Sequence, residues 1–470
     1  MEKKFKYLFK NTGLLMVGNF SSKILIFLLV PFYTSILTTS EYGTYDLVYS
    51  SILMLLPALS LNIIDGVMRF TIGETREKQN ETFTIGLKYI TVSCIVMAVV
   101  LSGLKYAFHN EVTTTYFWEI LFLYIGYALN QFTIQFARGI DDIIGVSIAG
   151  VISTGVMIAG NLVFLLWIKI GLSGYFWAYI LSFLAPAIFL SFRDQMYQYL
   201  VFSKIRLGVS KEERAIVRYS LPLMVTTLSW YINGVADRYA VTYFCGIDAN
   251  GIYSVAYKIP SILNAIQTIF IQAWQLSAIR ELGEKKGEQF YNATYEGCQT
   301  IMVVLCSGLI LGTRIIARIL FAKDFYVAWM YVPTLLLYIV FNTMSGVIGG
   351  VFAAVKDTKA FASSAAIGAL VNIVLNTVLV YAWHAEGAAI ATVISSIVIW
   401  GMRVHYSRKH IRLHINWKKH FLEYFILGAQ AIVMTVVVGQ MAYLFQALAF
   451  ATIIILNKNM IMTFIKRIKG

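Results

Sequence analysis

Three positively charged side chains lie inside long apolar runs, where an ionised group has few partners. Lys23 lies about 11 residues into the first run, on the same helical stripe as Asn19 and Ser22. Arg238 and Lys258 each lie about seven residues from a short polar turn, on consecutive runs. A charge near the centre of a membrane-spanning helix costs roughly 2.5 to 3.5 kcal/mol, so each cation is expected to face protein or water. These three residues are therefore candidates for binding an anion.

Further candidates are of three kinds. Basic residues near the predicted inner ends of helices could form a cationic cavity mouth: Lys88, Arg69, Arg138 and Arg280. Uncharged polar residues inside apolar runs could line a polar cavity or join helices: Gln267, Asn342, Asn372 and Asn376. Acidic residues are candidate ion-coupling groups: Asp46, Asp65 and Asp237. Asp65 and Arg69 also have the spacing of a helix ion pair, and Asp237 is an alternative partner for Arg238.

The elements that must position these side chains are membrane-spanning helices. The chain has 470 residues, of which 59% are hydrophobic and 13% charged, and its mean hydropathy is +0.71. A water-soluble domain does not have this balance. Runs of about 20 apolar residues recur along the chain, whereas barrel strands would alternate over about 10 residues. The predicted fold is an all-α, polytopic membrane protein.

Charge clusters and Gly, Pro and Asn turns divide the chain into about fourteen predicted spans. The spans lie near residues 12–37, 44–68, 82–106, 115–137, 143–168, 172–192, 216–245, 251–279, 297–320, 327–355, 360–383, 387–404, 420–445 and 447–465. A short polar turn at Ser40–Gly43 separates the first two. We predict an N-terminal six-helix bundle, a cytoplasmic linker, a C-terminal six-helix bundle and an addition of one cytoplasmic loop with two helices: 1–192, 193–215, 216–404 and 405–470.

The basic residues fall mainly on one side of this topology. Of the 38 Lys and Arg residues, 29 lie on the side of the N-terminus, and the six within residues 403–419 are among them. Short cytoplasmic loops retain positive charge, so both termini are predicted to be cytoplasmic. The net charge of +14 then reflects topology and contact with anionic lipid, and no nucleic-acid partner is expected.

The two predicted bundles share short sequence matches. GTYDLVY (Gly43–Tyr49) matches GIYSVAY (Gly251–Tyr257), and a proline follows each copy, Pro57 and Pro260. GYFWAYILS, which begins at Gly174, matches GAAIATVIS, which begins at Gly387, at almost the same shift. Small and aromatic residues recur by chance in membrane helices, but these matches also agree with the topology. We therefore predict a duplicated six-helix unit with prolines at helix bends.

Motifs of catalysis are missing from the sequence. It contains no GxxxxGK[ST], HExxH, GxSxG or CxxC pattern, and no residue is assigned a catalytic or metal-binding role. The predicted outer loops are too short for a sizeable external domain with an acidic catalytic site. An enzyme such as a membrane glycosyltransferase or polymerase is therefore disfavoured, and transport is favoured.

The N-terminal segment GNFSSKILIFLLVPFYTSILTTSEYGTYDLV and the later GAAIATVIS resemble the polysaccharide transporter family, the Wzx-type lipid-linked oligosaccharide flippases of the MOP superfamily. The most specific part is SEYGTYDL, Ser40–Leu47. The resemblance implies two six-helix bundles around a central cavity, opened alternately to each side of a bacterial cytoplasmic membrane. It implies an undecaprenyl-diphosphate-linked oligosaccharide as substrate, for capsule, exopolysaccharide or O-antigen synthesis, with polymerases and glycosyltransferases as partners.

By this resemblance, Lys23, Arg238 and Lys258 become contacts for the diphosphate or an acidic sugar, and no cofactor is required. Two other branches of the superfamily remain as alternatives: a MurJ-like lipid II flippase and a MATE-type multidrug exporter. A cationic cavity has the wrong sign for organic cations, which disfavours the exporter. The acidic candidates could carry a proton or sodium ion, or the membrane potential could drive an anionic substrate outward.

Overall fold

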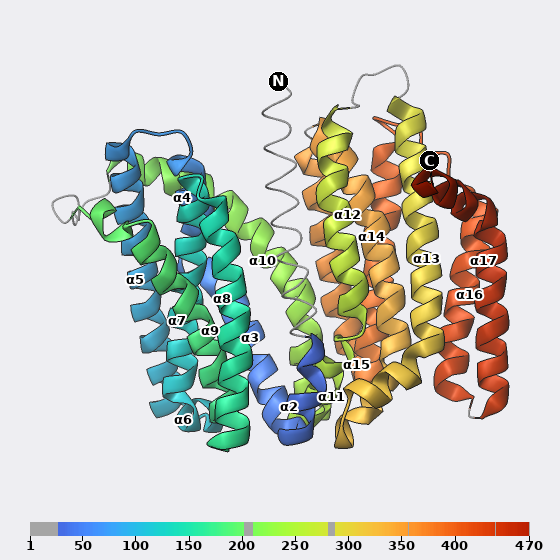
Figure 1. Ribbon diagram of the computed structural model, residues 1–470, viewed down its shortest axis with the longest axis horizontal. Helices are drawn as coiled ribbons and strands as arrows, with labels where there is room; N and C mark the ends of the chain where they lie inside the picture. Colours follow the sequence, from blue (N-terminus) through green and yellow to red (C-terminus); the bar gives the residue numbers. More distant parts are fainter. Residues whose placement is uncertain (1–26, 202–209, 281–286, 356, 438, 470) are drawn as a thin grey trace. The chain divides into compact units, whose positions relative to one another are not determined.

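The computed structural model describes residues 27–201, 210–280, 287–355, 357–437 and 439–469, and every regular element within these ranges is a helix (Figure 1). It divides into two compact units, unit 1 (Met1–Val235) and unit 2 (Ala236–Gly470), with the boundary inside helix α10. Most of the predicted span 12–37, with Lys23, Asn19 and Ser22, lies outside the described residues.

Unit 1 is built around α7, which packs against α4, α5 and α9. On α7, Phe132 and Phe136 are fully buried, and their rings lie 5.1 and 4.7 Å from the ring of Phe83 on α5. The helices of unit 1 are α2 Val30–Ile36, α3 Thr39–Leu59, α4 Ile63–Thr71, α5 Arg76–Tyr106, α6 Glu111–Thr115, α7 Phe117–Gly139, α8 Ile143–Asn161 with its π-helical extension Leu162–Trp167, α9 Gly171–Arg193, the 3-10 turn Met196–Tyr199 and most of α10 Lys211–Cys245.

Helix α3 begins earlier than the sequence suggested. Thr38 caps it, since the Thr38 hydroxyl accepts from the Glu41 backbone N–H at 3.2 Å and the Glu41 carboxylate accepts from the Thr38 N–H at 2.8 Å. This reciprocal capping box satisfies two backbone donors that the first turn would otherwise leave unpaired. The predicted polar turn at Ser40–Gly43 was therefore wrong, because these residues form the first turn of α3.

A break separates α3 from α4, and the two helices are bent by 60°. Pro57 removes a backbone donor near the end of α3, and Leu61 and Asn62 adopt left-handed conformations with φ of 53° and 51°. The Asn62 N–H donates to the Pro57 carbonyl at 2.8 Å, which closes the turn. The bend that Pro57 predicted is confirmed, and span 44–68 is one broken helix pair.

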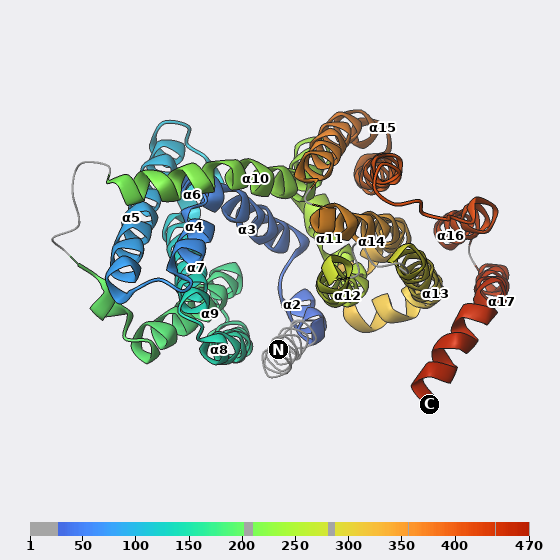
Figure 2. The same ribbon diagram turned by 90° about the horizontal axis from the view of Figure 1, so that it is seen from above.

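Unit 2 is built around α14, which packs against α12, α13 and α15; Figure 2 shows α13 and α14 end-on beside one another. Trp274 of α12 donates its indole N–H to the carbonyl of Val347 on α14 at 2.8 Å. The helices of unit 2 are α11 Ile247–Ala256, α12 Pro260–Arg280, α13 Gly287–Leu320, the 3-10 segment Lys323–Met330, α14 Val332–Val355, α15 Thr358–Ser407, α16 Trp417–Val436 and α17 Gln440–Lys469.

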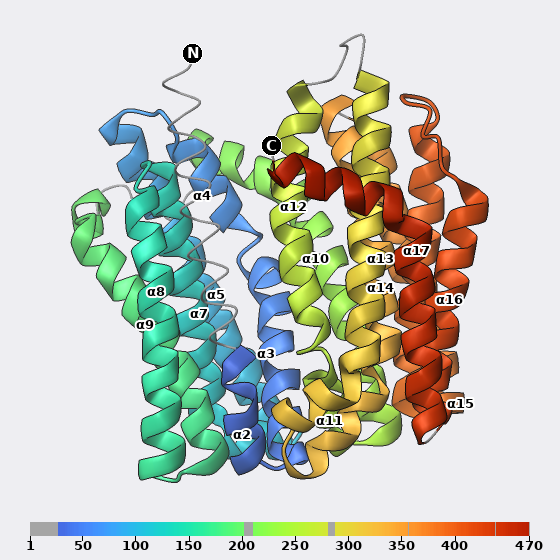
Figure 3. The ribbon, with the colours of Figure 1, turned by 45° about the vertical axis from the view of Figure 1, so that its right-hand side comes forward.

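The two final helices, α16 and α17, lie beside α13 (Figure 3). Buried polar side chains join them: Glu423 accepts from Gln299 at 3.1 Å and from Asn457 at 2.8 Å, and Thr300 donates to Asn457 at 2.8 Å. The predicted boundary between spans 420–445 and 447–465 was wrong. Helix α16 ends at Val436 and α17 begins at Gln440, because Gly439, with φ of 101°, forms the turn.

Within the described residues, eight helices are long and apolar enough to cross a membrane, or nine if the bent pair of α3 and α4 counts as one span. Helix α15 counts once among these, although it has a non-helical break at Trp383 and His384, where the sequence separated spans 360–383 and 387–404. The prediction of an all-α, polytopic membrane protein is confirmed. The total of fourteen spans stays a prediction.

Candidate functional site

Asp237, on α10, is the acidic candidate that lies in unit 2, and it is 0% exposed. One carboxylate oxygen, Oδ2, accepts from the hydroxyls of Tyr253 at 3.0 Å, Tyr257 at 2.9 Å and Thr392 at 2.6 Å. The other, Oδ1, accepts from the side-chain amides of Asn376 at 2.7 Å and Asn372 at 3.4 Å. We call these six residues the Asp237 centre.

Three helices bring the Asp237 centre together. Asn372 and Asn376 are one turn apart on the first half of α15, so both face the same side. The break at Trp383 and His384 folds the second half of α15 back, and the Asn372 amide donates to the Thr392 hydroxyl at 3.3 Å. Tyr253 lies in α11 and Tyr257 caps its C-terminal end.

The chemistry of the Asp237 centre suits a small cation. A buried carboxylate needs compensation, and the five hydrogen bonds to Asp237 come from neutral donors. The side-chain oxygen of Asn376 is buried without a hydrogen-bond partner among the described residues. Carboxylate, amide and hydroxyl oxygens are ligands for hard cations. If the Asp237 carboxyl were protonated instead, its O–H would donate to one of these neighbouring oxygens. Among the described residues no three His, Cys, Asp or Glu side chains cluster as metal ligands.

Arg238 and Lys258 both lie next to Tyr257 of this centre. The Arg238 guanidinium lies 5.3 Å from the centre of the Tyr257 ring, and Lys258 follows Tyr257 in the turn between α11 and α12. Both residues are half-buried. Since the Tyr257 hydroxyl donates to Asp237, the two cations lie close to the buried carboxylate.

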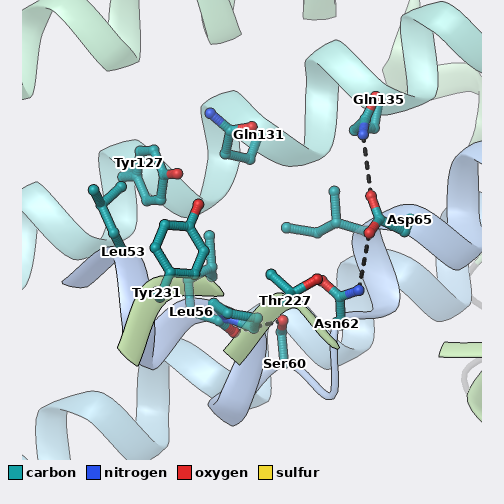
Figure 4. Close-up of a pocket in the computed structure, with 12 residues that line it drawn as sticks. Leu53, Leu56, Ser60, Asn62, Asp65, Tyr127, Gln131, Gln135, Thr227 and Tyr231 are labelled. Carbon is teal, nitrogen blue, oxygen red and sulfur yellow. Dashed lines mark hydrogen bonds between the residues drawn. The ribbon is translucent and has the colours of Figure 1, made fainter. Parts of the chain in front are cut away.

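Unit 1 contains a polar pocket of about 120 Å³, shown in Figure 4. Its lining comes from α3, α4, α7 and α10 and from the break between α3 and α4. The residues that line it are Leu53, Leu56, Pro57, Ser60, Asn62, Ile64, Asp65, Tyr127, Gln131, Gln135, Thr227 and Tyr231. None of them is basic, so the unit 1 pocket is neutral apart from the carboxylate of Asp65.

Asp65 is held in place by amides of the unit 1 pocket. The side chains of Asn62 and Gln135 donate to the two carboxylate oxygens of Asp65 at 2.9 and 3.2 Å. The left-handed conformation of Asn62 lets its side chain reach forward to Asp65. These bonds replace the predicted ion pair with Arg69, which is exposed. Arg138 donates to the side-chain oxygen of Gln135 at 3.1 Å, and the side-chain amide of Gln135 in turn donates to Asp65.

The remaining predicted candidates do not belong to the Asp237 centre or to the lining of the unit 1 pocket as described. Lys88 forms a salt bridge with Glu213 at 3.0 Å, and Tyr89 donates to the same carboxylate at 3.0 Å, so its charge is already compensated. Asp46 is half-buried in α3, Asn342 is half-buried in α14, and Gln267 is buried in α12 with its side-chain oxygen unpaired among the described residues. Arg280 ends α12, and its side chain lies outside the described residues, as do Lys23, Asn19 and Ser22.

Sequence reasoning missed several polar groups. Tyr253, Tyr257 and Thr392 stood inside the repeated segments but were not assigned a role, and Gln131 and Gln135 are one turn apart in an apolar run. That spacing was the available signal for the unit 1 pocket. Arg403, counted with the loop charges, is 1% exposed inside α15, where it donates to the Ser364 hydroxyl at 3.1 Å and the Ser345 carbonyl at 3.0 Å.

Solved structures with a similar fold are transporters. The chain resembles a lipid II flippase MurJ in an inward closed conformation, with a TM-score of 0.68 and 14% identity over 95% of this chain and 99% of that one. It also resembles an inward-facing multidrug resistance MATE family transporter of the MOP superfamily, with a TM-score of 0.66 and 14% identity over 84% of this chain and 94% of that one. At these identities the likeness concerns the fold.

Sequence comparison identifies a related protein and a family. A protein from Haloferax volcanii, described as a probable low-salt glycan biosynthesis flippase Agl15, is 21% identical over 214 residues. The match covers 44% of this chain and 45% of that relative, so it spans less than half of the curated relative's length. Residues 8–275 match the family model described as polysaccharide biosynthesis protein. This match covers more than half of the chain, which therefore belongs to the polysaccharide biosynthesis protein family.

Proposed function

We propose that this protein is a flippase that moves an undecaprenyl-diphosphate-linked oligosaccharide repeat unit from the cytoplasmic to the outer leaflet by alternating access. The observation that carries the proposal is the family match, on a polytopic helical chain with polar side chains buried inside both units. The fold of a lipid II flippase and the flippase description of the Haloferax volcanii relative support it. Its product would serve capsule, exopolysaccharide or O-antigen synthesis, beside glycosyltransferases and a polymerase.

The buried cations have a chemical task in this proposal. A diphosphate must cross a hydrocarbon layer, and compensating its charge with Lys and Arg lowers the barrier while the prenyl tail stays in lipid. Arg238, beside the Tyr257 ring, and Lys258, the residue after Tyr257, are the proposed contacts in unit 2, together with Lys23 of the first span. Lys88 is less available because Glu213 already holds it.

The Asp237 centre is the proposed coupling site, where binding of a proton or a sodium ion would drive transport. Its support is a fully buried carboxylate surrounded by neutral donors and an unpaired amide oxygen of Asn376. Asp65 is the second candidate, although amides already occupy both of its oxygens, and Asp46 is the third. The proposed location is the bacterial cytoplasmic membrane, with both termini in the cytoplasm.

A reconstitution experiment tests the proposed function. Purified protein in liposomes should move a fluorescent undecaprenyl-diphosphate-linked oligosaccharide between leaflets, so that a membrane-impermeant quencher reaches a growing fraction of it.

In cells, deletion of the gene for this protein should leave repeat units on the cytoplasmic leaflet, and Lys23→Ala should partly reproduce this. Lys169→Ala, at an exposed lysine of unit 1, is the matched control and should transport normally. Normal outer-leaflet delivery in a deletion strain without a redundant flippase would refute the proposal.

The same liposomes separate the alternatives. Transport of lipid II in place of the oligosaccharide would favour the MurJ-like reading, whose fold the chain shares. Export of organic cations, with no effect of Lys23→Ala, would favour the MATE-type reading, whose fold it shares as well. Transfer of sugar by the purified protein would instead support an enzyme.

A further inference from the structure

The unit 1 pocket has the chemistry of a carbohydrate site. We propose that it binds one neutral pyranose ring of the lipid-linked oligosaccharide; this inference rests on the proposed function for the identity of the sugar-bearing molecule. The polar side chains of the pocket are amides, hydroxyls and one carboxylate, contributed mainly by Asn62, Asp65, Gln131 and Gln135. Sugar hydroxyls both donate and accept, so these groups complement them.

One amide of the unit 1 pocket is open to a ligand. Gln131 makes no hydrogen bond within the described residues, and Figure 4 shows it beside the hydroxyls of Tyr127 and Tyr231. An amide in an apolar helix is costly when it is unsatisfied, so it needs water or a ligand. Gln131 can offer two donors and one acceptor to adjacent sugar hydroxyls, which is the pattern that a ring with neighbouring hydroxyls requires.

The shape of the unit 1 pocket also fits a sugar ring. Tyr127 and Tyr231 supply aromatic surfaces, and Leu53 and Leu56 supply apolar walls for the C–H faces of a ring. Ligand sites in proteins combine such walls with a few placed polar groups. The volume of about 120 Å³ is less than the roughly 150 Å³ of a protein cavity that takes up a benzene ring, and a pyranose is larger than benzene. The pocket therefore has room for part of one sugar ring and not for a chain of several sugars.

The charge of the unit 1 pocket excludes the diphosphate and acidic sugars. Asp65 is its one charged lining residue, and an anion brought close to this carboxylate would be repelled in a medium of low dielectric constant. Arg138 is not among the residues that line the pocket; it is exposed and donates to the Gln135 oxygen. Anionic parts of the substrate are thus assigned to the cations of unit 2, and a neutral sugar is assigned to unit 1.

Direct binding to the purified full chain in detergent tests this inference. The probes are methyl glycosides of glucose, galactose and N-acetylglucosamine, with methyl glucuronide and glucose 1-phosphate as anionic counterparts. Saturation-transfer-difference NMR, which detects weak ligands, should report binding of at least one neutral glycoside, and neither anion should displace that glycoside. Gln131→Ala should lower the affinity for the neutral glycoside by at least about tenfold, since a hydrogen bond to the ligand is lost.

Two further variants make the test specific. Gln198→Ala removes an exposed glutamine side chain of the same unit outside the pocket and should bind the glycoside as the wild type does. Asp65→Asn removes the repulsion and should let methyl glucuronide displace the neutral glycoside. Because Gln131 has no hydrogen-bond partner among the described residues, Gln131→Ala should remain folded, which size-exclusion chromatography checks.

The outcomes separate this inference from the proposed function. Failure of every neutral glycoside to bind, or equal binding by Gln131→Ala and the wild type, would overturn the inference and show a pocket filled with water alone. Liposomes that flip the oligosaccharide at the wild-type rate with Gln131→Ala would overturn it as well and leave the flippase proposal intact. Glycoside binding without flipping would support the sugar site and count against the flippase.

Discussion

Asp237 shows how this protein keeps a carboxylate inside a helical unit. The cost of burying a charge is offset by hydrogen bonds to Tyr253, Tyr257, Thr392, Asn372 and Asn376, each from a neutral group. These neutral donors distinguish Asp237 from Lys88, whose salt bridge to Glu213 makes a structural role the simpler interpretation.

Asp237→Asn should abolish coupling to the ion gradient. The asparagine lacks the charge and has an N–H₂ group in place of one of the two accepting oxygens, so charge-assisted bonds to Asp237 are lost in either orientation of the amide. We expect the gradient-driven flipping rate in liposomes to fall by about tenfold or more. Sodium or protons should raise the thermal midpoint of the wild type but not that of the variant.

Asp248→Asn is the matched control, because Asp248 is an exposed aspartate on α11 of the same unit. It should keep both the flipping rate and the ion effect on the thermal midpoint. Retention of gradient-driven flipping by Asp237→Asn would remove Asp237 from the coupling mechanism and direct attention to Asp65.

Asp194, just after α9, is expected to make stability depend on pH. Burial, followed by a hydrogen bond and repulsion from Asp142, raises the pKa of Asp194 to about 7. Burial also opposes ionisation of Asp142, but hydrogen bonds from Arg193 and the Gly145 N–H lower the pKa of Asp142 below its usual value. The folded chain therefore binds a proton at Asp194 more tightly than the unfolded chain does. The contribution of Asp194 to the free energy of unfolding is present at low pH and is lost as the pH rises from about 4 through 7.

Asp194→Asn should remove this part of the pH dependence. The difference in thermal midpoint between variant and wild type should grow in favour of the variant between pH 5 and pH 8, as measured by scanning fluorimetry. Asp141→Asn, at an exposed neighbouring aspartate, should leave the slope unchanged. A constant difference between Asp194→Asn and the wild type across this range would contradict the assignment.

At the scale of helices, the two repeated segments occupy comparable places. Tyr45 and Tyr49 of the first copy stack at 5.8 Å in α3, and Tyr253 and Tyr257 of the second are 5.4 Å apart, edge to face, at α11. A break follows each copy, beyond Pro57 in unit 1 and before Pro260 in unit 2. Duplication stays a prediction, and these positions agree with it.

The second pair of repeated segments each begins just after a helix break. Gly174 lies three residues into α9, and Gly387 lies three residues beyond His384, which has φ of 54°. Within this repeat Thr392 matches Tyr179, whose ring lies 4.8 Å from that of Tyr45. If the two units are duplicated, the aromatic cluster of unit 1 corresponds in position to the Asp237 centre of unit 2.

Gly387→Ala should disrupt the break in α15. A Cβ at this position would overlap the backbone carbonyl of Leu379, which a side-chain rotation cannot relieve. Overpacking costs about 1 to 3 kcal/mol, and backbone overlap puts this case at the upper end, so we expect the thermal midpoint to fall by about 5 °C or more. Since the break positions Thr392 against Asp237, the ion effect on the midpoint should decrease too.

Gly401→Ala is the control on the same helix, because a Cβ there would meet no neighbouring atom within 4 Å. It should leave the midpoint unchanged or raise it slightly, since alanine favours helix. A Gly387→Ala variant as stable as Gly401→Ala would show that the break tolerates a side chain and would contradict the packing argument.

At the scale of the whole molecule, the distribution of basic residues predicts both termini in the cytoplasm. Green fluorescent protein fused after Gly470 should therefore fluoresce, and alkaline phosphatase fused there should be inactive. The opposite pattern would show an odd number of spans or the reverse orientation. Fusions after Lys169, a predicted outer position, provide the internal control and should give active phosphatase.

Much of the helical architecture could be predicted because apolar runs report burial in lipid directly. The span predicted at 115–137 became α7, Phe117–Gly139, and the one at 172–192 became α9, Gly171–Arg193. Errors occurred where a local cap or turn decided the boundary. Thr38 and Glu41 begin α3 early, and Gly439 ends the turn before α17 through its positive φ.

The sequence by itself determined the class of the protein, since twenty-residue apolar runs and their basic flanks require a polytopic helical fold. It also singled out Asp237, Asn372 and Asn376 as polar groups in apolar surroundings. Tertiary structure alone decided that Thr392, 155 residues from Asp237, donates to the same carboxylate and that Gln135, 70 residues from Asp65, holds it. The physical reason is that hydropathy reports how deeply a residue is buried, whereas the partner of a buried polar group depends on which helices pack together.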